Sequence, residues 1–233
     1  MIPKKIHYCW FGRGEKPKDV LKCIESWKKF CPDYEIIEWN EDNFDISSHP
    51  YTKKAYELRK WAFVSDYARL YIIYNEGGVY LDTDVEIVKN LDPLLENEAY
   101  MGFEDEKYVA NGLGFGAIKG HSFVLANMSA YDGERLVDEN GNFAAVSCPV
   151  YTTKLLNDAG LVNDNGKIQK VLDVTVYPRE YLCPYNYITG TMKMTENTYS
   201  VHLYSMSWLG KAQIFKSKFT RIFHSYDRRR RAS

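Results

Sequence analysis

The first third of the sequence alternates between short apolar runs and longer helical patterns, and this order limits the possible folds more than any other feature. Strands are predicted over Lys5 to Trp10, Glu35 to Trp39 and Val79 to Leu81, and helices over Asp19 to Phe30 and Thr52 to Asn75. Strand, helix, strand, helix, strand at these spacings implies right-handed crossovers between parallel strands. We therefore expect an α/β fold, with a mostly parallel sheet flanked by helices on both faces.

Two aspartates follow the third predicted strand. The run Gly77 to Asp84 reads GGVYLDTD, in which two glycines end the helical pattern and Asp82 and Asp84 stand two positions apart. Side chains alternate faces in extended backbone, so the two carboxylates point the same way. Such a pair repels unless donors or a cation lie between the charges, and Mg²⁺ and Mn²⁺ favour carboxylate oxygens and substrate phosphates. The same spacing is also common in solvated turns, so the neighbouring sequence has to distinguish a metal site from a turn.

A charged pair stands in the apolar helix just before this strand. Asp66 and Arg69 are three residues apart and share a helical face. A surface ion pair would explain the spacing, but the stretch Trp61 to Leu70 is rich in aromatic and aliphatic residues, where an idle charged pair is costly to bury. We interpret the pair as ligand contacts.

The ends of the predicted strands suggest where a ligand would bind. In open α/β sheets ligands bind beyond the carboxyl ends of the strands. Trp10 ends the first predicted strand, and the aspartates at 82 and 84 follow the third. We expect these residues to line one pocket.

Three separated motifs resemble those of family 32 of the glycosyltransferases. They are IPKKIHYCWFG at residues 2–12, the stretch 61–95 with SDxxRL and GGxYLDxD, and, more loosely, HLYSMSW at 202–208. This family has a DXD sugar-binding region and includes yeast OCH-type mannosyltransferases and bacterial capsule enzymes. The sequence is also similar to the catalytic domain of clostridial glucosylating toxins. The resemblance implies a single GT-A type, Rossmann-like domain over residues 1–210 that uses a nucleotide-sugar donor.

The resemblance also assigns roles near the diphosphate. Asp84 would bind the metal directly, whereas Asp82 would contact the ribose or donor sugar and reach the metal through water. Manganese or magnesium is the implied ion. His202 is our candidate for a third ligand, although the toxins have a carboxylate in the related stretch and a core histidine is the alternative. Ser207 and Trp208 would donate hydrogen bonds to phosphate oxygens.

Other residues are assigned to the donor by the same resemblance. Trp10 would stack on the nucleobase, and Asp66 and Arg69 would hold the hydroxyls of the donor sugar. Asn111 would approach the same sugar. Arg69 and the two aspartates of the DXD motif would form the catalytic group.

These assignments predict a metal-dependent, retaining glycosyltransferase that moves a hexose from a nucleotide-sugar to a glycan. We favour UDP-galactose or UDP-glucose as donor, with a GDP-mannose-using mannosyltransferase or a non-catalytic carbohydrate-binding scaffold protein as alternatives. A nucleotidyltransferase is disfavoured because no basic glycine-rich loop follows the first strand. We expect a same-face reaction, since nothing in the sequence singles out a carboxylate nucleophile.

Composition limits the class of protein and the compartment in which it works. The formal net charge of −1 argues against a nucleic-acid-binding protein. Five cysteines without a CxxC spacing argue against a disulfide framework and favour a reducing compartment. Neither a signal peptide nor an apolar stretch of about 20 residues is visible. We expect a cytoplasmic, bacterial enzyme.

The C-terminal residues 211–233 form a basic tail. Lysines and arginines recur from Lys211 to Arg231, and Phe215, Phe219 and Phe223 recur at helical spacing. This pattern is typical of an amphipathic helix on an anionic membrane, although a packed terminal helix with a solvated arginine tail is equally consistent. Membrane binding would place the enzyme at the inner membrane face, where its acceptor would be a lipid-linked glycan of surface polysaccharide synthesis.

The middle of the chain carries weaker signals. Strands are predicted over Ala99 to Phe103 and Leu113 to Ile118, and helices over His121 to Tyr131 and Val150 to Ala159. The polar segment Asp132 to Asn142 is expected to be an exposed loop.

Overall fold

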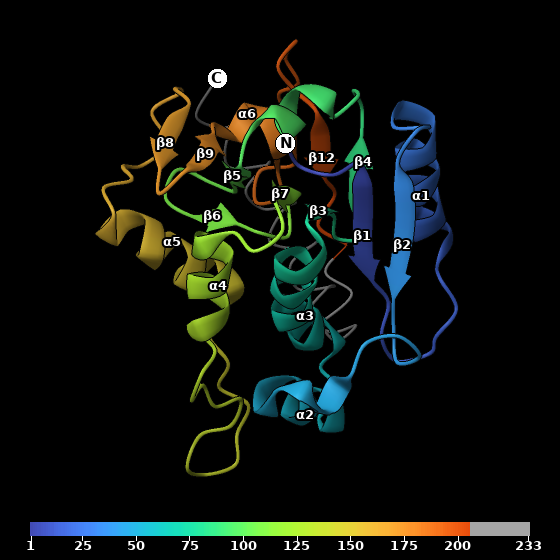
Figure 1. Cartoon of the computed structure of the whole chain (residues 1–233), viewed down its shortest axis with the longest axis vertical. Helices are drawn as coiled ribbons and strands as arrows, with labels where there is room; N and C mark the ends of the chain where they lie inside the picture. The colour runs from blue at the N-terminus through green and yellow to red at the C-terminus, as the bar shows by residue number, and fades with distance from the viewer. Residues whose placement is uncertain (206–233) are drawn as a thin grey trace, which may run out of the picture.

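A computed structural model describes residues 1–205 of the chain, and an eight-stranded sheet forms its centre (Figure 1). The sheet order is β2-β1-β3-β7-β5-β9-β8, with β6 paired to β5. The strands are β1 Lys5–Cys9, β2 Glu35–Trp39, β3 Gly78–Tyr80, β5 Ala99–Phe103, β6 Val109–Ala110, β7 Phe115–Ala117, β8 Gln169–Val171 and β9 Val174–Tyr177.

Most strands of the sheet point in one direction. β1 is parallel to both β2 and β3, and β5 is parallel to β9. β7 is antiparallel to both β3 and β5, so those two strands also run the same way. The carboxyl ends of β2, β1, β3, β5 and β9 therefore lie along one edge. The expected mostly parallel α/β sheet is confirmed.

Helices cover both faces of the sheet, as the alternating pattern predicts. They are α1 Lys18–Phe30, α2 Pro50–Glu57, α3 Trp61–Glu76, α4 Ser122–Ser129, α5 Cys148–Asp158 and the short α6 Arg179–Leu182, with 3₁₀ turns at Ile46–Ser48 and Asp92–Glu96. One apolar cluster holds the buried face of α3, and a second holds that of α1. Burial of these two faces removes apolar surface from water, which is the main driving force for this layering.

Two small sheets lie beside the large one. β4 (Val85–Ile87) pairs antiparallel with β12 (Ser200–His202), and β10 (Tyr185–Asn186) pairs antiparallel with β11 (Thr191–Met192). The Trp27 indole N–H donates to the Val85 carbonyl at 2.8 Å and ties α1 to β4. Through β4 and β12, the last described residues return to the segment that follows β3.

The long helix expected over Thr52 to Asn75 is wrong in one respect, because the chain forms two helices there. α2 ends at Glu57 and α3 begins at Trp61. Between them Arg59 has φ 55°, a left-handed conformation that ends a helix. Neither glycine nor proline marks this break in the sequence, and the packing of Trp61 against Tyr56, with ring centroids 5.0 Å apart, accompanies it.

The other elements differ from expectation mainly at their ends. α4 begins one residue after His121, whose Nδ1 accepts the Phe123 N–H as an N-cap. α5 begins at Cys148, two residues before the predicted start, and proline stands in its first turn. The segment 132–142 contains no helix and is largely exposed, as expected.

Candidate functional site

The two aspartates follow β3 at the carboxyl edge of the sheet. Gly77 ends α3 with φ 67°, and Gly78 has φ 110°, both in the region that favours glycine. A Cβ on Gly78 would come within 2.9 Å of the Lys5 carbonyl, so the helix can turn into the sheet only without side chains here. The Leu81 N–H still donates to the backbone carbonyl of His7 in β1, at 3.0 Å. This bond places Asp82 directly beyond the sheet.

Asp84 is held by residues that lie about 120 positions later in the chain. His202 Nε2 is 3.1 Å from Asp84 Oδ1, and the Ser205 N–H and hydroxyl donate to Oδ2 at 2.8 and 3.0 Å. Burial opposes ionisation of Asp84, but His202 and Ser205 outweigh it and hold its pKa below the usual range. Burial likewise opposes the imidazolium of His202, yet Asp84 raises the His202 pKa above its ordinary value. The two groups therefore form a charged pair.

Arg69 lies between two carboxylates. Its Nη2 is 3.0 Å from Asp66 Oδ1 and 3.0 Å from Asp82 Oδ1, and its Nη1 donates to Asn111 Oδ1 at 3.1 Å. The Tyr80 hydroxyl also donates to Asp82 Oδ1, at 3.1 Å. Burial raises the pKa of Asp66 to about 6, with Arg69 acting against it, and burial also raises the pKa of Asp82. The structure thus brings together four of the residues that the sequence assigned to the donor.

Gly112 leaves the space that this cluster needs. A Cβ at this position would overlap the Asp82 carboxylate and would come within 3.1 Å of Arg69 Nη1. Glycines recur at positions 112, 114 and 116. The groups that lie close to Gly112 are the Asp82 carboxylate and the Arg69 guanidinium of the site.

The arrangement fits a divalent metal ion. Asp82, Asp84 and His202 each offer a ligand atom, and these atoms lie within 4.8 Å of one another. His202 Nδ1 is buried and has no hydrogen-bond partner within residues 1–205. Two carboxylates and an imidazole suit Mn²⁺, and carboxylates with water suit Mg²⁺. The donor set therefore agrees with the ions that the sequence implied.

Trp10 is placed at the same edge, directly after β1 and thus beside β3. Its indole N–H donates to the Gly14 carbonyl at 2.7 Å, and its ring is half-buried. Its role toward a nucleobase stays a prediction. Ser207, Trp208 and the tail from Lys211 to Arg231 lie outside the described residues.

Several residues near the site were missed by the sequence analysis. Ser205 binds Asp84, and the Cys148 thiol lies 3.9 Å from Arg69 Nη1 at the start of α5. Glu104 follows β5 at the same edge, and burial raises its pKa while His202 and Tyr204 act against that shift. A carboxylate after a predicted strand was a usable signal for Glu104, but the direction of that strand was not predictable.

Three buried polar atoms near the Asp66 side of the site have no hydrogen-bond partner within residues 1–205. They are Tyr51 Oη, Tyr131 Oη and Asn127 Oδ1. The two tyrosine rings meet edge to face, 4.9 Å apart, and burial together with the charge of Asp66 raises both pKa values. Buried polar atoms of this kind bind water or a ligand hydroxyl.

Comparison with known proteins finds a matching family. Residues 17–101 match the family described as glycosyltransferase sugar-binding region containing DXD motif. This part of the chain resembles that glycosyltransferase family. The matched segment contains α1, α3, β3 and both aspartates of the DXD motif, and ends in β5.

Relatives and a solved structure agree with this assignment. The chain is 32% identical over 128 residues to inositol phosphoceramide mannosyltransferase 3 of Schizosaccharomyces pombe, and the match covers 53% of the chain and 35% of the relative. It is 32% identical over 106 residues to the initiation-specific alpha-1,6-mannosyltransferase of Candida albicans, and this match covers 41% of the chain and 28% of the relative. The chain spans about a third of the length of the curated relatives it matches.

The fold is that of the GT-A glycosyltransferases. The solved structure of the PaToxG glycosyltransferase matches with a TM-score of 0.50 at 19% identity, over 67% of this chain and 69% of that one. This likeness concerns the fold alone. Along residues 1–205, no helix has the length and apolar character needed to cross a bilayer.

Proposed function

We propose that this glycosyltransferase transfers a hexose from a nucleotide-sugar to a glycan in a metal-dependent reaction. The observation that carries the proposal is the convergence of Asp82, Asp84 and His202 at the carboxyl edge of the sheet, with ligand atoms within 4.8 Å of one another. When bound there, a divalent cation would neutralise the charge that develops on the departing diphosphate. The match of residues 17–101 to the DXD family supports the same chemistry.

The residues around this centre would bind and orient the donor. Arg69 is fixed by Asp66 and Asp82, so its guanidinium needs little rearrangement to meet the sugar hydroxyls. Asp66, with a pKa of about 6, can accept a hydrogen bond from a hydroxyl when ionised. Trp10 would stack on the nucleobase, and Ser207 and Trp208 would donate to the diphosphate. The Asn111 side-chain oxygen, which accepts a hydrogen bond from Arg69 Nη1, would hold the guanidinium in place.

The reaction that we propose retains the configuration of the anomeric carbon. The acceptor oxygen attacks the same face from which the diphosphate leaves, so one C–O bond forms as the other breaks. The leaving phosphate oxygen takes the proton of the acceptor hydroxyl, and no protein nucleophile is required. Trapping a covalent glycosyl-enzyme on Glu104, or on any other carboxylate, would contradict this route.

The sugar itself distinguishes two forms of the proposal. The sequence favoured UDP-galactose or UDP-glucose, with GDP-mannose as the alternative. Relatives named as mannosyltransferases support GDP-mannose. Relatives named for inositol phosphoceramide also support an acceptor linked to a lipid. We further propose that the basic residues of the 211–233 tail bring the enzyme to an anionic membrane that carries such an acceptor.

Donor hydrolysis tests the proposal directly. We would incubate the parent protein and Asp84→Asn with UDP-glucose, UDP-galactose and GDP-mannose, with and without Mn²⁺, and measure released nucleotide. Metal-dependent release from one donor, lost in the variant, is expected and names the sugar. Absence of both hydrolysis and nucleotide binding across the panel would instead favour a non-catalytic carbohydrate-binding protein.

A further inference from the structure

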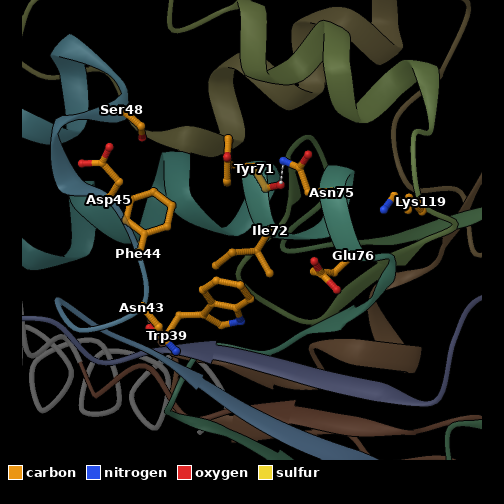
Figure 2. Close-up of a pocket in the computed structure, with 10 residues that line it drawn as sticks. All are labelled: Trp39, Asn43, Phe44, Asp45, Ser48, Tyr71, Ile72, Asn75, Glu76 and Lys119. Carbon is orange, nitrogen blue, oxygen red and sulfur yellow. Dashed lines mark hydrogen bonds between the residues drawn. The ribbon is translucent and has the colours of Figure 1, made fainter.

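A second concave site lies between α3 and the edge strand β2 (Figure 2). It is a pocket of about 440 Å³, a volume within the range of small-molecule sites. Within residues 1–205, no residue that makes a hydrogen bond or ion pair with Asp82 or Asp84 lines it. Its walls come from Trp39, the segment that follows β2, the last two turns of α3, and Lys119.

The pocket faces away from the donor side of α3. Tyr71 and Asn75 line it, whereas Asp66 and Arg69 carry the contacts of the DXD site. At about 100° per residue, positions 71 and 75 project from the side of the helix opposite to position 66. A ligand here would therefore be separate from the reacting sugar.

The aromatic floor of the pocket is rigidly held. The Trp39 indole N–H donates to His7 Nδ1 at 3.0 Å. Because Nδ1 accepts this bond, the ring proton of His7 is on Nε2, which lies 3.0 Å from the Gly77 carbonyl and donates to it. Burial lowers the pKa of His7 to about 4 and keeps the ring neutral. These two hydrogen bonds fix the orientation of Trp39.

The shape of the aromatic wall argues against a flat ligand. Phe44 and Tyr71 meet edge to face, with ring centroids 5.7 Å apart and planes at 88°. Two perpendicular rings form a corner and leave no parallel slot for a nucleobase. A corner of this kind fits the C–H faces of a puckered sugar ring, and Tyr71 is 37% exposed and available for contact.

The polar part of the pocket favours a neutral ligand rich in hydroxyls. Asp45 and Glu76 bring negative charge, but Glu76 is 3.2 Å from Lys5, and Lys119 lies on the same wall. Two carboxylates and two ammonium groups leave no net charge to select an ion. The Asn75 amide nitrogen already donates to the Tyr71 carbonyl at 2.8 Å, so its amide oxygen is the group left to accept from a ligand. Figure 2 shows Asp45, Asn75, Glu76 and Lys119 among the residues that line the pocket with Trp39 and Ile72.

We infer that this pocket binds a neutral hexose unit of a glycan, at a distance from the reacting end. The inference rests on the proposed function in one respect, since the glycan would be the acceptor or product of the transfer. Trp39, Phe44 and Tyr71 supply the apolar contacts, and Asn75 and Asp45 supply hydrogen bonds. Such a site would hold a growing or branched chain while its end occupies the catalytic edge.

Binding of neutral trisaccharides tests the inference without any donor. We would titrate the protein with the trisaccharides of mannose, glucose and galactose, and measure binding by calorimetry and saturation-transfer NMR. One trisaccharide should bind with a dissociation constant near the millimolar range. Tyr71→Ala and Asn75→Ala should each weaken binding at least about fivefold, since a lost aromatic or hydrogen-bond contact is worth roughly 1 kcal/mol.

Two control variants separate this site from the donor site. Tyr108→Ala removes a tyrosine of similar exposure, 41% against 37% for Tyr71, that does not line the pocket, and Asp84→Asn disables the DXD site. Both should bind the trisaccharide as the parent does. Failure of all three trisaccharides to bind, undiminished binding in Tyr71→Ala, or loss of binding in Asp84→Asn would overturn the inference. If the parent protein binds a trisaccharide through Tyr71 but hydrolyses no donor, the inference about the pocket stands and the proposed glycosyl transfer is contradicted.

Discussion

Arg69 Nη2 lies 3.0 Å from Asp82 Oδ1, and the arginine is 4% exposed while it makes this contact. Asp66 occupies the other side of the same nitrogen. The guanidinium therefore neutralises two carboxylates that would otherwise face each other in a buried site. Stability therefore depends on a side chain that we also propose to bind the donor.

Removing Arg69 should destabilise the protein as well as inactivate it. Arg69→Ala leaves Asp66 and Asp82 buried without their common partner, and breaking a buried pair in this way costs about 3–5 kcal/mol. The free energy of unfolding in urea measures the effect. Arg13→Ala is the control, because its ion pair with Asp42 is exposed and should contribute less than about 1 kcal/mol. Equal stability of the two variants would mean that Arg69 has no structural role.

Gly112→Ala should remove activity while leaving most of the fold intact. A methyl group here overlaps the Asp82 carboxylate and crowds Arg69, so the aspartate must move from its place beside Arg69. We expect at least about a hundredfold lower donor hydrolysis, since misplacement by about 1 Å can cost that much. Gly14→Ala is the matched control because nothing lies within 4 Å of its Cβ position. Parent-like turnover by Gly112→Ala would show that the Asp82 position is not critical.

Metal affinity should rise with pH. Asp84 raises the pKa of His202 above its ordinary value, and the imidazole must lose its proton before it can bind a metal. The affinity for Mn²⁺ should therefore be weaker at about pH 6 than at about pH 8, where more of the histidine is neutral. Calorimetric titration at both values measures this. In His202→Asn the dependence should be flatter, and an unchanged slope would exclude His202 as the titrating ligand.

His7 should make the fold sensitive to acid. Its folded pKa of about 4 lies below the ordinary 6.5, so the unfolded chain binds the proton more readily. Its contribution to stability is complete above about pH 6.5 and is lost as the pH falls toward 4, and it amounts to roughly 3 kcal/mol. The difference in unfolding free energy between the parent and His7→Asn isolates it from other groups. A difference that stays constant over this range would contradict the shift.

The sequence predicted the sheet edge well because the relevant signals are local. Period-two alternation, the two glycines after α3 and the i, i+3 spacing of Asp66 and Arg69 each depend on a few neighbouring residues. The break at Arg59 was missed because no glycine or proline marks it. Ser205 and Cys148 were missed for another reason. Their contacts with Asp84 and Arg69 span 121 and 79 residues, and only the pairing of β4 with β12 and the position of α5 bring them there.

The pairing of β4 with β12 also has a consequence for the order in which the protein is made. Asp84 leaves the ribosome early, with the strands and helices that surround it, whereas its partners His202 and Ser205 are among the last of the described residues to be synthesised. The nascent chain can form the first three parallel strands and the Arg69 cluster long before the imidazole arrives. A chain arrested before residue 200 should therefore hold the donor side of the site without its charged Asp84–His202 pair, which would delay any metal-dependent reaction until translation of the domain is nearly complete.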